Sequence, residues 1–203
     1  VFLGTSFLAD VFFVAFRIPN TFRRLFAEGT FNAAFVPNYT SKLIKGKNQS
    51  NKFANEVFNI LFLILLILTL VAQIFMPGLV GLLAPGFVEN SEKIELATKL
   101  TRITFPFLML VCLSSFFSAI LNSHNKFAAA SAAPIILNVV LIIVLLFSKF
   151  LNDELVYYLS YGVSIGGLIQ LIFLYKFVIE YYSPKFNFKI KLNKDLKLFF
   201  SKL

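Results

Sequence analysis

The segment from Asp10 to Pro37 has the apolar composition of a membrane helix but carries side chains that could bind a charged ligand. Its five ionisable residues are Asp10, Arg17, Arg23, Arg24 and Glu28. A charge at membrane depth usually faces a cavity, a partner or the interface, and a guanidinium offers a planar fork that matches phosphate oxygens. The pattern favours an anion-binding site within the membrane. Placement of these charges at the two membrane boundaries is the alternative.

Pro19 lies inside this segment and is expected to break the hydrogen-bond ladder of the helix. Broken helices at membrane depth commonly line a cavity. Arg23 and Arg24 project about 100° apart on a helix, and Glu28 lies one turn beyond Arg24, where the two can form an ion pair. Arg23 has no such partner in the local sequence. We therefore expect Arg23 to be the main anion contact.

The composition predicts an all-α, polytopic membrane protein. Of the 203 residues, 58% are hydrophobic and only 14% are charged, with a mean hydropathy of +0.80, whereas soluble domains are about a quarter charged. A single cysteine, Cys112, excludes an internal disulfide framework. The net charge of +9 lies in short loops rather than on a face interleaved with aromatic residues, so no nucleic-acid partner is expected.

Five membrane spans are expected, each with about 20 apolar residues, the length that crosses the hydrocarbon layer. They cover residues 6–39, 57–83, 103–121, 127–148 and 155–175, the first broken at Pro19 and the second ending in a short interfacial piece after Pro77. Residues 1–180 would form one transmembrane bundle, and residues 181–203 a basic amphipathic linker along the cytoplasmic surface. The chain does not begin with Met, and we expect a preceding helix to be missing.

Lysine is distributed unevenly among the segments that join these spans. Residues 42–52, residues 122–127 and the C-terminal tail carry an excess of Lys, whereas residues 86–99 and 149–155 balance Lys with Asp and Glu. Because Lys and Arg are enriched in cytoplasmic loops, we expect the three basic segments to be cytoplasmic.

Several motifs carry a resemblance to a known family. They are "LADVFFVAFRIPNTFRRLFAEGTFNAAFVP" from Leu8, "LAPGF" from Leu83, "TRITFPFLML" from Thr101, "AILNSHNKF" from Ala119, "APIILN" from Ala133 and "GVSIGGLIQL" from Gly162. In sequence and spacing, nearly the whole chain resembles the MurJ (MviN) lipid II flippases, which belong to the multidrug, oligosaccharidyl-lipid and polysaccharide exporter superfamily. The resemblance implies helices two to six of the N-terminal lobe of a roughly fourteen-helix transporter.

The resemblance also implies a function. Such a protein flips lipid II, the undecaprenyl-pyrophosphate-linked disaccharide-pentapeptide used in peptidoglycan biosynthesis, from the inner to the outer leaflet of the bacterial cytoplasmic membrane. It does so by alternating access, and cavity arginines hold the pyrophosphate. Matched to the family motifs, the implied substrate contacts are Arg23, Arg24, Arg17 and Asn138, and the implied gating residues or charge partners are Asp10 and Glu28.

No catalytic residue, metal or cofactor is implied, because the membrane potential or an ion gradient would drive transport. The implied partners are lipid II and membrane lipids, with other cell-wall synthesis proteins as further candidates. Arginines of the family's first helix and C-terminal lobe have no counterpart in this sequence, so the chain alone is not expected to transport.

Two other functions remain open within the superfamily. One is a flippase for another polyprenyl-linked oligosaccharide, and the other is a drug or cation antiporter, which would need a membrane-embedded acid such as Asp10. The arginines favour anionic cargo over the antiporter. An enzyme acting on lipid carriers would need acid–base pairs, a metal site or a His nucleophile, and one His and one Cys make that function unfavourable.

Overall fold

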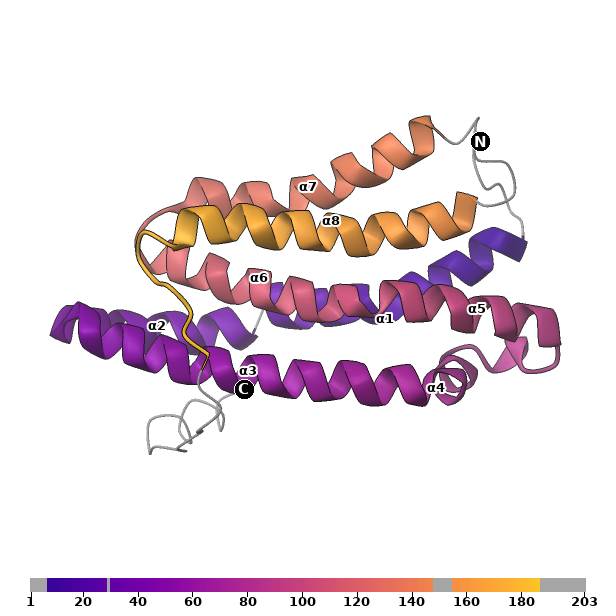
Figure 1. The fold of residues 1–203 in the computed structure, drawn as a ribbon, viewed down its shortest axis with the longest axis horizontal. Coiled ribbons are helices and arrows are strands. Elements are labelled where there is room, and N and C mark those ends of the chain that lie inside the picture. Colours follow the sequence, from indigo (N-terminus) through magenta and orange to yellow (C-terminus); the bar gives the residue numbers. More distant parts are fainter. Residues whose placement is uncertain (1–6, 29, 148–154, 187–203) are drawn as a thin grey trace.

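The computed structural model describes residues 7–28, 30–147 and 155–186, without the side chains of residue 18 and residues 22–28 and 30. These residues form helices, and none of them lies in a strand, so the predicted all-α class is confirmed. The elements are α1 (Phe7–Glu28), α2 (Thr30–Lys45), α3 (Lys47–Ile74), α4 (Met76–Leu83), the 3-10 turn η1 (Pro85–Phe87), α5 (Ser91–Thr104), α6 (Pro106–Ser123), α7 (Phe127–Leu146) and α8 (Leu155–Val178). The long helices lie side by side in an elongated bundle (Figure 1).

Within the described residues, four helical segments are long and apolar enough to cross a membrane. They are Lys47–Ile74, Ser91–Ser123 (α5 and α6 together), Phe127–Leu146 and Leu155–Val178. These correspond to the last four predicted spans. The second predicted span begins earlier than expected, at Lys47 rather than residue 57, and so does the third, at Ser91 rather than residue 103. The short α4, with Pro77 at its start, is separate from α3, as expected for the piece after Pro77.

The first predicted span, residues 6–39, is helical as expected and consists of two helices. Its helices α1 and α2 meet near residue 29, and neither is among the membrane-length apolar segments. Residues 7–24 of α1 contain one Asp and three Arg, which is too many charges for a simple lipid-facing span. This part of the chain is helical as expected, but its sequence suits a protein-lined or water-lined position.

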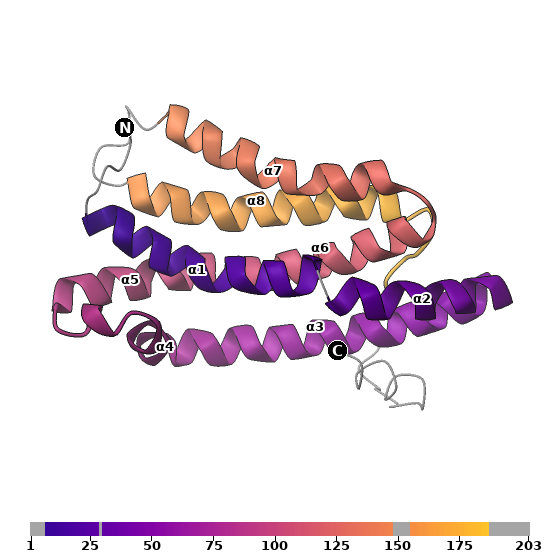
Figure 2. The same ribbon diagram turned by 180° about the vertical axis from the view of Figure 1, so that it is seen from behind.

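The predicted break at Pro19 is wrong, because α1 continues through this proline to Glu28. Proline has no N–H and therefore removes the helical donor to the carbonyl of Ala15. Thr104 replaces that donor, since its hydroxyl Oγ1 donates a hydrogen bond of 2.7 Å to the Ala15 oxygen. With this carbonyl satisfied from a neighbouring helix, α1 continues past the proline. Figure 2 shows that α1 is bent rather than straight.

An aromatic core joins the middle of the bundle to its end near residue 124. The ring of Phe116 on α6 lies 5.2 to 6.4 Å from the rings of five neighbours, measured between centroids. These neighbours are Phe31, Phe35, Phe58, Phe117 and Tyr182. Because they come from α2, α3, α6 and the segment after α8, burial of this one ring ties four parts of the chain together.

The segment after α8 turns back along α3. Tyr182 Oη donates a hydrogen bond of 2.9 Å to Asn55 Oδ1, and the backbone N–H of Lys185 donates one of 2.7 Å to the same oxygen. Asn59 Nδ2 donates a bond of 3.0 Å to the Lys185 carbonyl. The first residues of the predicted linker are thus fixed to the bundle, whereas residues 187–203, where the amphipathic stretch was predicted, lie outside the described residues.

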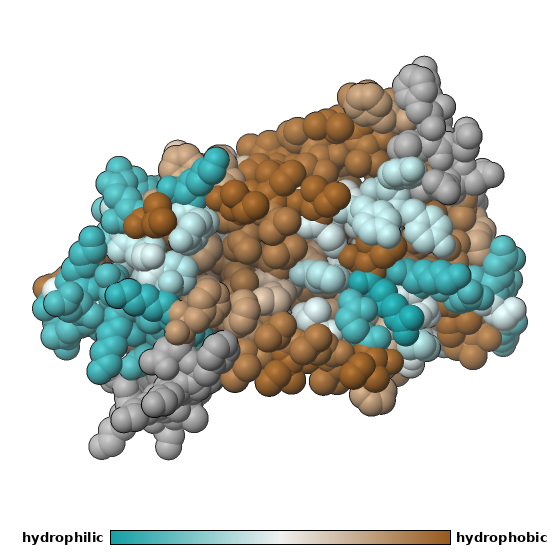
Figure 3. Space-filling model, viewed as in Figure 1, coloured by the Kyte–Doolittle hydropathy of each residue, from teal (hydrophilic) through white to brown (hydrophobic). Residues whose placement is uncertain are grey.

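The connections with excess Lys gather at one end of the bundle. Tyr39 Oη on α2 lies 3.2 Å from His124 Nε2 in the α6–α7 turn, within hydrogen-bond distance. The His124 ring stacks on Tyr181 after α8 at a centroid distance of 4.4 Å. Figure 3 shows the corresponding surface pattern, with hydrophilic residues at both ends and an apolar band between them. This is the pattern of a bundle whose middle contacts lipid.

Candidate functional site

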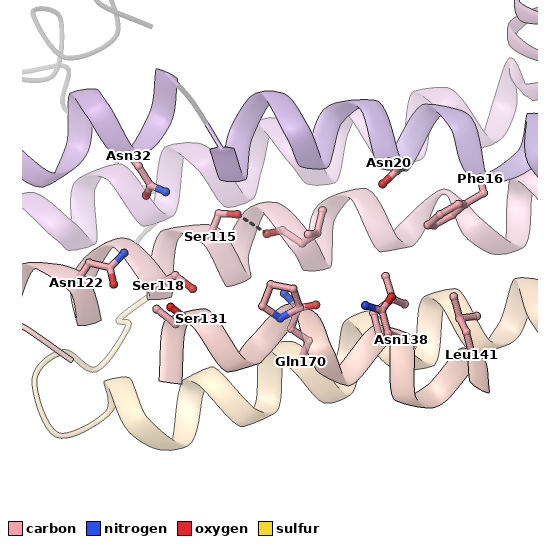
Figure 4. Close-up of a pocket in the computed structure, with 14 residues that line it drawn as sticks. Phe16, Asn20, Asn32, Ser115, Ser118, Asn122, Ser131, Asn138, Leu141 and Gln170 are labelled. Carbon is pink, nitrogen blue, oxygen red and sulfur yellow. Dashed lines mark hydrogen bonds between the residues drawn. The ribbon is translucent and has the colours of Figure 1, made fainter. Parts of the chain in front are cut away.

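A cavity of about 350 Å³ lies between the α1–α2 pair and helices α6, α7 and α8 (Figure 4). Its polar lining consists of amide and hydroxyl side chains, namely Asn20, Asn32, Ser115, Ser118, Asn122, Ser131, Asn138 and Gln170. Its apolar lining consists of Phe16, Val111, Ala130, Pro134, Leu137 and Leu141. The size and the mixture of apolar walls with a few convergent polar groups are typical of ligand-binding cavities.

The lining residues that the structure describes carry no charge. Amide side chains offer both donors and acceptors, and serine hydroxyls can do either. One of the hydroxyls is already used, because Ser115 Oγ donates a hydrogen bond of 3.0 Å to the carbonyl of Val111 in the same helix. The described lining therefore suits hydroxyl, amide or water partners, and an anion would need a cation from elsewhere.

Two glycines on α8 hold this helix close to α7. A Cβ added at Gly166 would lie 2.9 Å from Leu137 Cδ1, and one at Gly162 would lie 3.2 Å from Val144 Cγ2. Gln170 follows at the same spacing of four residues, so it shares the α7-facing side of α8. The GxxxG pair thus sets the depth at which the Gln170 amide enters the cavity wall.

The predicted site residues are only partly assembled here. Asn138 lines the cavity and projects from α7 beside it. Arg17 and Asp10 are exposed on α1 and are not among the lining residues. The helical backbone of α1 includes Arg23, Arg24 and Glu28, but their side chains lie outside the described part of the structure. The implied arginine contacts and charge partners therefore remain predictions.

Most of the cavity lining was not anticipated. Asn20, Asn122 and Gln170 lie within the motifs that carry the resemblance, but they were not singled out as site residues, and the serines look like ordinary membrane-helix residues. One usable signal was present, since Gln170 continues the spacing of Gly162 and Gly166. In the part of the chain that the structure describes, no three His, Cys, Asp or Glu residues gather as metal ligands would.

A separate aromatic and histidine cluster lies at the Lys-rich end of the bundle. His124 contacts Tyr39 on one side and Tyr181 on the other. Partial burial, with a smaller contribution from the positive charge of Lys47, lowers the pKa of His124 below its ordinary value. The neutral imidazole is thus favoured at this junction of α2, the α6–α7 turn and the end of α8.

Sequence comparison finds relatives along the whole chain. A family model described as "Lipid II flippase MurJ" matches residues 1–203. The probable lipid II flippase MurJ of Rhizobium tropici is 44% identical over 178 residues, covering 85% of this chain and 33% of the relative. The probable lipid II flippase MurJ of Rickettsia prowazekii (strain Madrid E) is 40% identical over 173 residues, covering 85% and 34%. The chain spans about a third of the length of these curated relatives.

A solved structure of the same family has a similar fold. Lipid II flippase MurJ in an inward closed conformation matches with a TM-score of 0.80 and 31% sequence identity. The match covers 99% of this chain and 41% of that chain. The resemblance carried by the sequence motifs is therefore confirmed by a family model, by curated relatives and by a solved fold. The chain belongs to the MurJ lipid II flippase family.

Proposed function

We propose that this chain forms part of a transporter that flips lipid II across the bacterial inner membrane, with its headgroup entering the cavity between α1 and α7. The family and four membrane-length helices identify a multi-pass protein of that membrane. The observation that carries the proposal is the polar cavity itself, which lies among these helices and is too large for a single water molecule. Polar side chains at membrane depth usually face a water-filled cavity or a substrate pathway, and a cavity of this kind can receive polar cargo.

Arg23 is proposed as the contact to the pyrophosphate. It follows Phe16 by seven residues and Asn20 by three, so helical periodicity puts its backbone position on the cavity-facing side of α1. A guanidinium there would supply the positive charge that the described lining lacks. Arg24 is proposed as a weaker contact, with Glu28 holding it. Arg17 is exposed on α1 outside the described lining, so its proposed contact with the headgroup lies outside this cavity.

Asn138 is proposed to bind the uncharged part of the headgroup, since it lines the same cavity from α7. Asp10 lies exposed near the start of α1, away from the lining residues, and is proposed as a gating or charge partner rather than a cargo contact. An antiporter would need its acid in the cavity, so this placement favours the flippase. The neutral lining would also fit another polyprenyl-linked oligosaccharide, which makes a flippase for such a lipid the second candidate.

The proposed cycle is alternating access, with the Lys-rich end of the bundle on the cytoplasmic side. Residues 42–52 and 122–127 lie at that end, together with the start of the C-terminal tail. The headgroup would enter from this side and leave from the other while its lipid tail stays in the bilayer. The membrane potential or an ion gradient would drive the cycle, and other cell-wall synthesis proteins are candidate partners. Because the chain covers about a third of its relatives, the remaining part of a full-length protein would complete the cavity.

The test uses the full-length protein in bacteria depleted of their own lipid II flippase. An impermeant enzyme that cleaves lipid II reports how much lipid II reaches the outer leaflet. Wild type is expected to restore cleavage, and Arg23→Ala to abolish it while inserting normally. Lys52→Ala is the control, because Lys52 is an exposed cation at the start of α3, outside the cavity.

The two parts of the proposal can fail separately. If wild type inserts but outer-leaflet lipid II stays inaccessible, the cargo is wrong and another polyprenyl-linked oligosaccharide becomes the better assignment. If wild type restores cleavage and Arg23→Ala does so equally well, the flippase assignment stands and the role of Arg23 is wrong.

A further inference from the structure

Gln170 is a buried amide with no protein partner in the part of the chain that the structure describes. Its side chain is only 6% exposed, and none of its polar atoms is hydrogen-bonded to a described residue. Buried polar side chains in folded proteins almost always have a hydrogen-bond partner. Because Gln170 lines the cavity, its amide can instead bond a group that enters this space, which is water in the ligand-free protein and cargo in the loaded one.

The amide is directed at the cavity rather than at lipid. Gln170 is among the lining residues, and Figure 4 shows it rising from α8 between the α7 residues that line the same space. Its helix cannot easily turn to give the amide another partner, because Gly166 already packs against Leu137. Gln170 therefore presents a carbonyl oxygen and an NH₂ group at a fixed position in the wall.

The groups beside it are also neutral. Ser131 and Asn138 on α7 and Ser118 on α6 line the same cavity. A site made of amides and hydroxyls can both donate and accept, which matches a partner that does the same. A pyrophosphate could use only the donors of this group, because its oxygens only accept, and it would need a positive charge that these residues do not supply.

We propose that Gln170 is a specificity-determining residue that hydrogen-bonds a neutral hydroxyl or amide group of the transported headgroup. This inference rests on the proposed function and adds a subsite to it, separate from the arginine contact to the pyrophosphate. In lipid II, such groups occur both on the disaccharide and on the peptide. A headgroup without them would leave the buried amide unsatisfied, and a site of this kind discriminates strongly against the analogue that lacks the partner.

The experiment measures equilibrium binding of three lipids to the full-length protein in lipid nanodiscs. The lipids are lipid II, its analogue without the peptide, and undecaprenyl pyrophosphate, which has neither sugar nor peptide. The variant is Gln170→Leu, with Gln170→Met as a second apolar side chain of closer length. Gln49→Leu is the matched control, because Gln49 is exposed at the start of α3 and lies outside the cavity.

Gln170→Leu and Gln170→Met are expected to weaken lipid II binding on the order of tenfold and to leave undecaprenyl pyrophosphate binding unchanged. If binding of the analogue without the peptide falls equally, the partner is on the sugar; if it does not fall, the partner is on the peptide. Gln49→Leu should bind all three lipids as wild type does. Equal weakening for all three lipids in the Gln170 variants, or no weakening for any, would overturn the proposal.

Stability separates this role from a structural one. Replacing an unpaired buried amide with an apolar side chain of similar size is expected to leave the ligand-free melting temperature unchanged or to raise it. A lower ligand-free melting temperature in both apolar variants would mean that the amide stabilises the bundle, and the inference would be wrong. If wild type binds undecaprenyl pyrophosphate but not lipid II, the proposed function itself fails, a result distinct from a failure of the Gln170 variants alone.

Discussion

Gln73 Nε2 donates a hydrogen bond of 2.9 Å to the carbonyl oxygen of Arg102, the oxygen that Pro106 leaves without its helical donor. Thr104 does the same for Ala15 opposite Pro19, and Ser164 Oγ on α8 donates to the neighbouring carbonyl of Ile103. Each donor comes from a different helix than its acceptor. An unpaired backbone oxygen in the membrane cannot hydrogen-bond to water instead. These bonds therefore remove the cost of the carbonyls that the two prolines leave without helical donors.

Gln73→Leu should therefore destabilise the junction of α5 and α6. The expected loss is about 1 kcal/mol, because the substitution removes one hydrogen bond to a backbone oxygen. Thermal unfolding of the detergent-solubilised full-length protein measures it. A double-mutant cycle gives the control, since Pro106→Ala restores an N–H in the chain and should reduce the cost of Gln73→Leu. Equal costs in both backgrounds would show that the bond to Arg102 does not matter.

Thr104→Val should have a larger effect, because this hydroxyl is buried. The substitution keeps the shape but leaves the Ala15 oxygen without its donor, at a cost of about 1–3 kcal/mol. Thr101→Val is the matched control, since Thr101 is equally buried but its hydroxyl bonds Ala97 within its own helix. Unfolding temperatures should fall more for Thr104→Val than for Thr101→Val. Pro19→Ala should lessen the stability loss caused by Thr104→Val, because it restores the helical donor to the Ala15 oxygen. If the loss is unchanged, Thr104 does not act by replacing that donor.

These bonds also explain where sequence reasoning was limited. Hydropathy and loop charge predict the four apolar segments and the ends at which their connections lie, because both depend on local composition. The effect of Pro19 depends on Thr104, which is 85 residues away in the chain, so no local pattern predicts a continuous α1. A proline in a sequence indicates a lost donor, and only the fold shows whether another donor replaces it.

The cavity residues also differ in how far the sequence alone could identify them. Asn138 could be singled out because its motif matches a family, and α1 because its charges are unusual in a membrane. Gln170 and Ser118 became site residues only when α8 and α6 were placed beside α7. Amides and serines are common in helix packing, so their type alone does not distinguish a binding residue from a packing residue.

Gly167→Ala should destabilise the contact between α8 and α6. An added Cβ would lie 2.4 Å from Phe107 Cδ2, and Phe107 is fully buried, so its ring has no free space to enter. Overpacking of this kind costs about 1–3 kcal/mol. The Phe107 ring also contacts Phe16, which lines the cavity, so binding of lipid II should weaken as well.

A second glycine provides the control for this prediction. Gly78→Ala in α4 adds the same methyl group where no atom lies within 4 Å. It should leave stability unchanged or raise it by about 0.5–1 kcal/mol, because Ala favours helix over Gly. Thermal unfolding of both variants tests the difference. Equal melting temperatures for the two would mean that α8 can move away from Phe107 at no cost.

His124 should make the stability of the Lys-rich end depend on pH. Its pKa is lowered in the folded protein, mainly by burial and further by Lys47, so the unfolded chain binds a proton more readily. The stabilising contribution is therefore complete above the ordinary histidine pKa, and it is lost as the pH falls through the lowered folded pKa. The Tyr39 hydroxyl and the Tyr181 ring contact the imidazole, so both lie beside the positive charge when His124 is protonated.

Melting temperatures of wild type and His124→Gln, measured from about pH 8 to about pH 5, test this. Gln keeps hydrogen-bonding capacity towards Tyr39 but does not titrate, so the variant should lose less stability on acidification than wild type. Tyr39→Phe serves as a second comparison, since it removes the hydroxyl and leaves the imidazole half-buried. It should be less stable at both ends of the range and keep most of the pH dependence. Parallel pH curves for wild type and His124→Gln would show that another group is responsible.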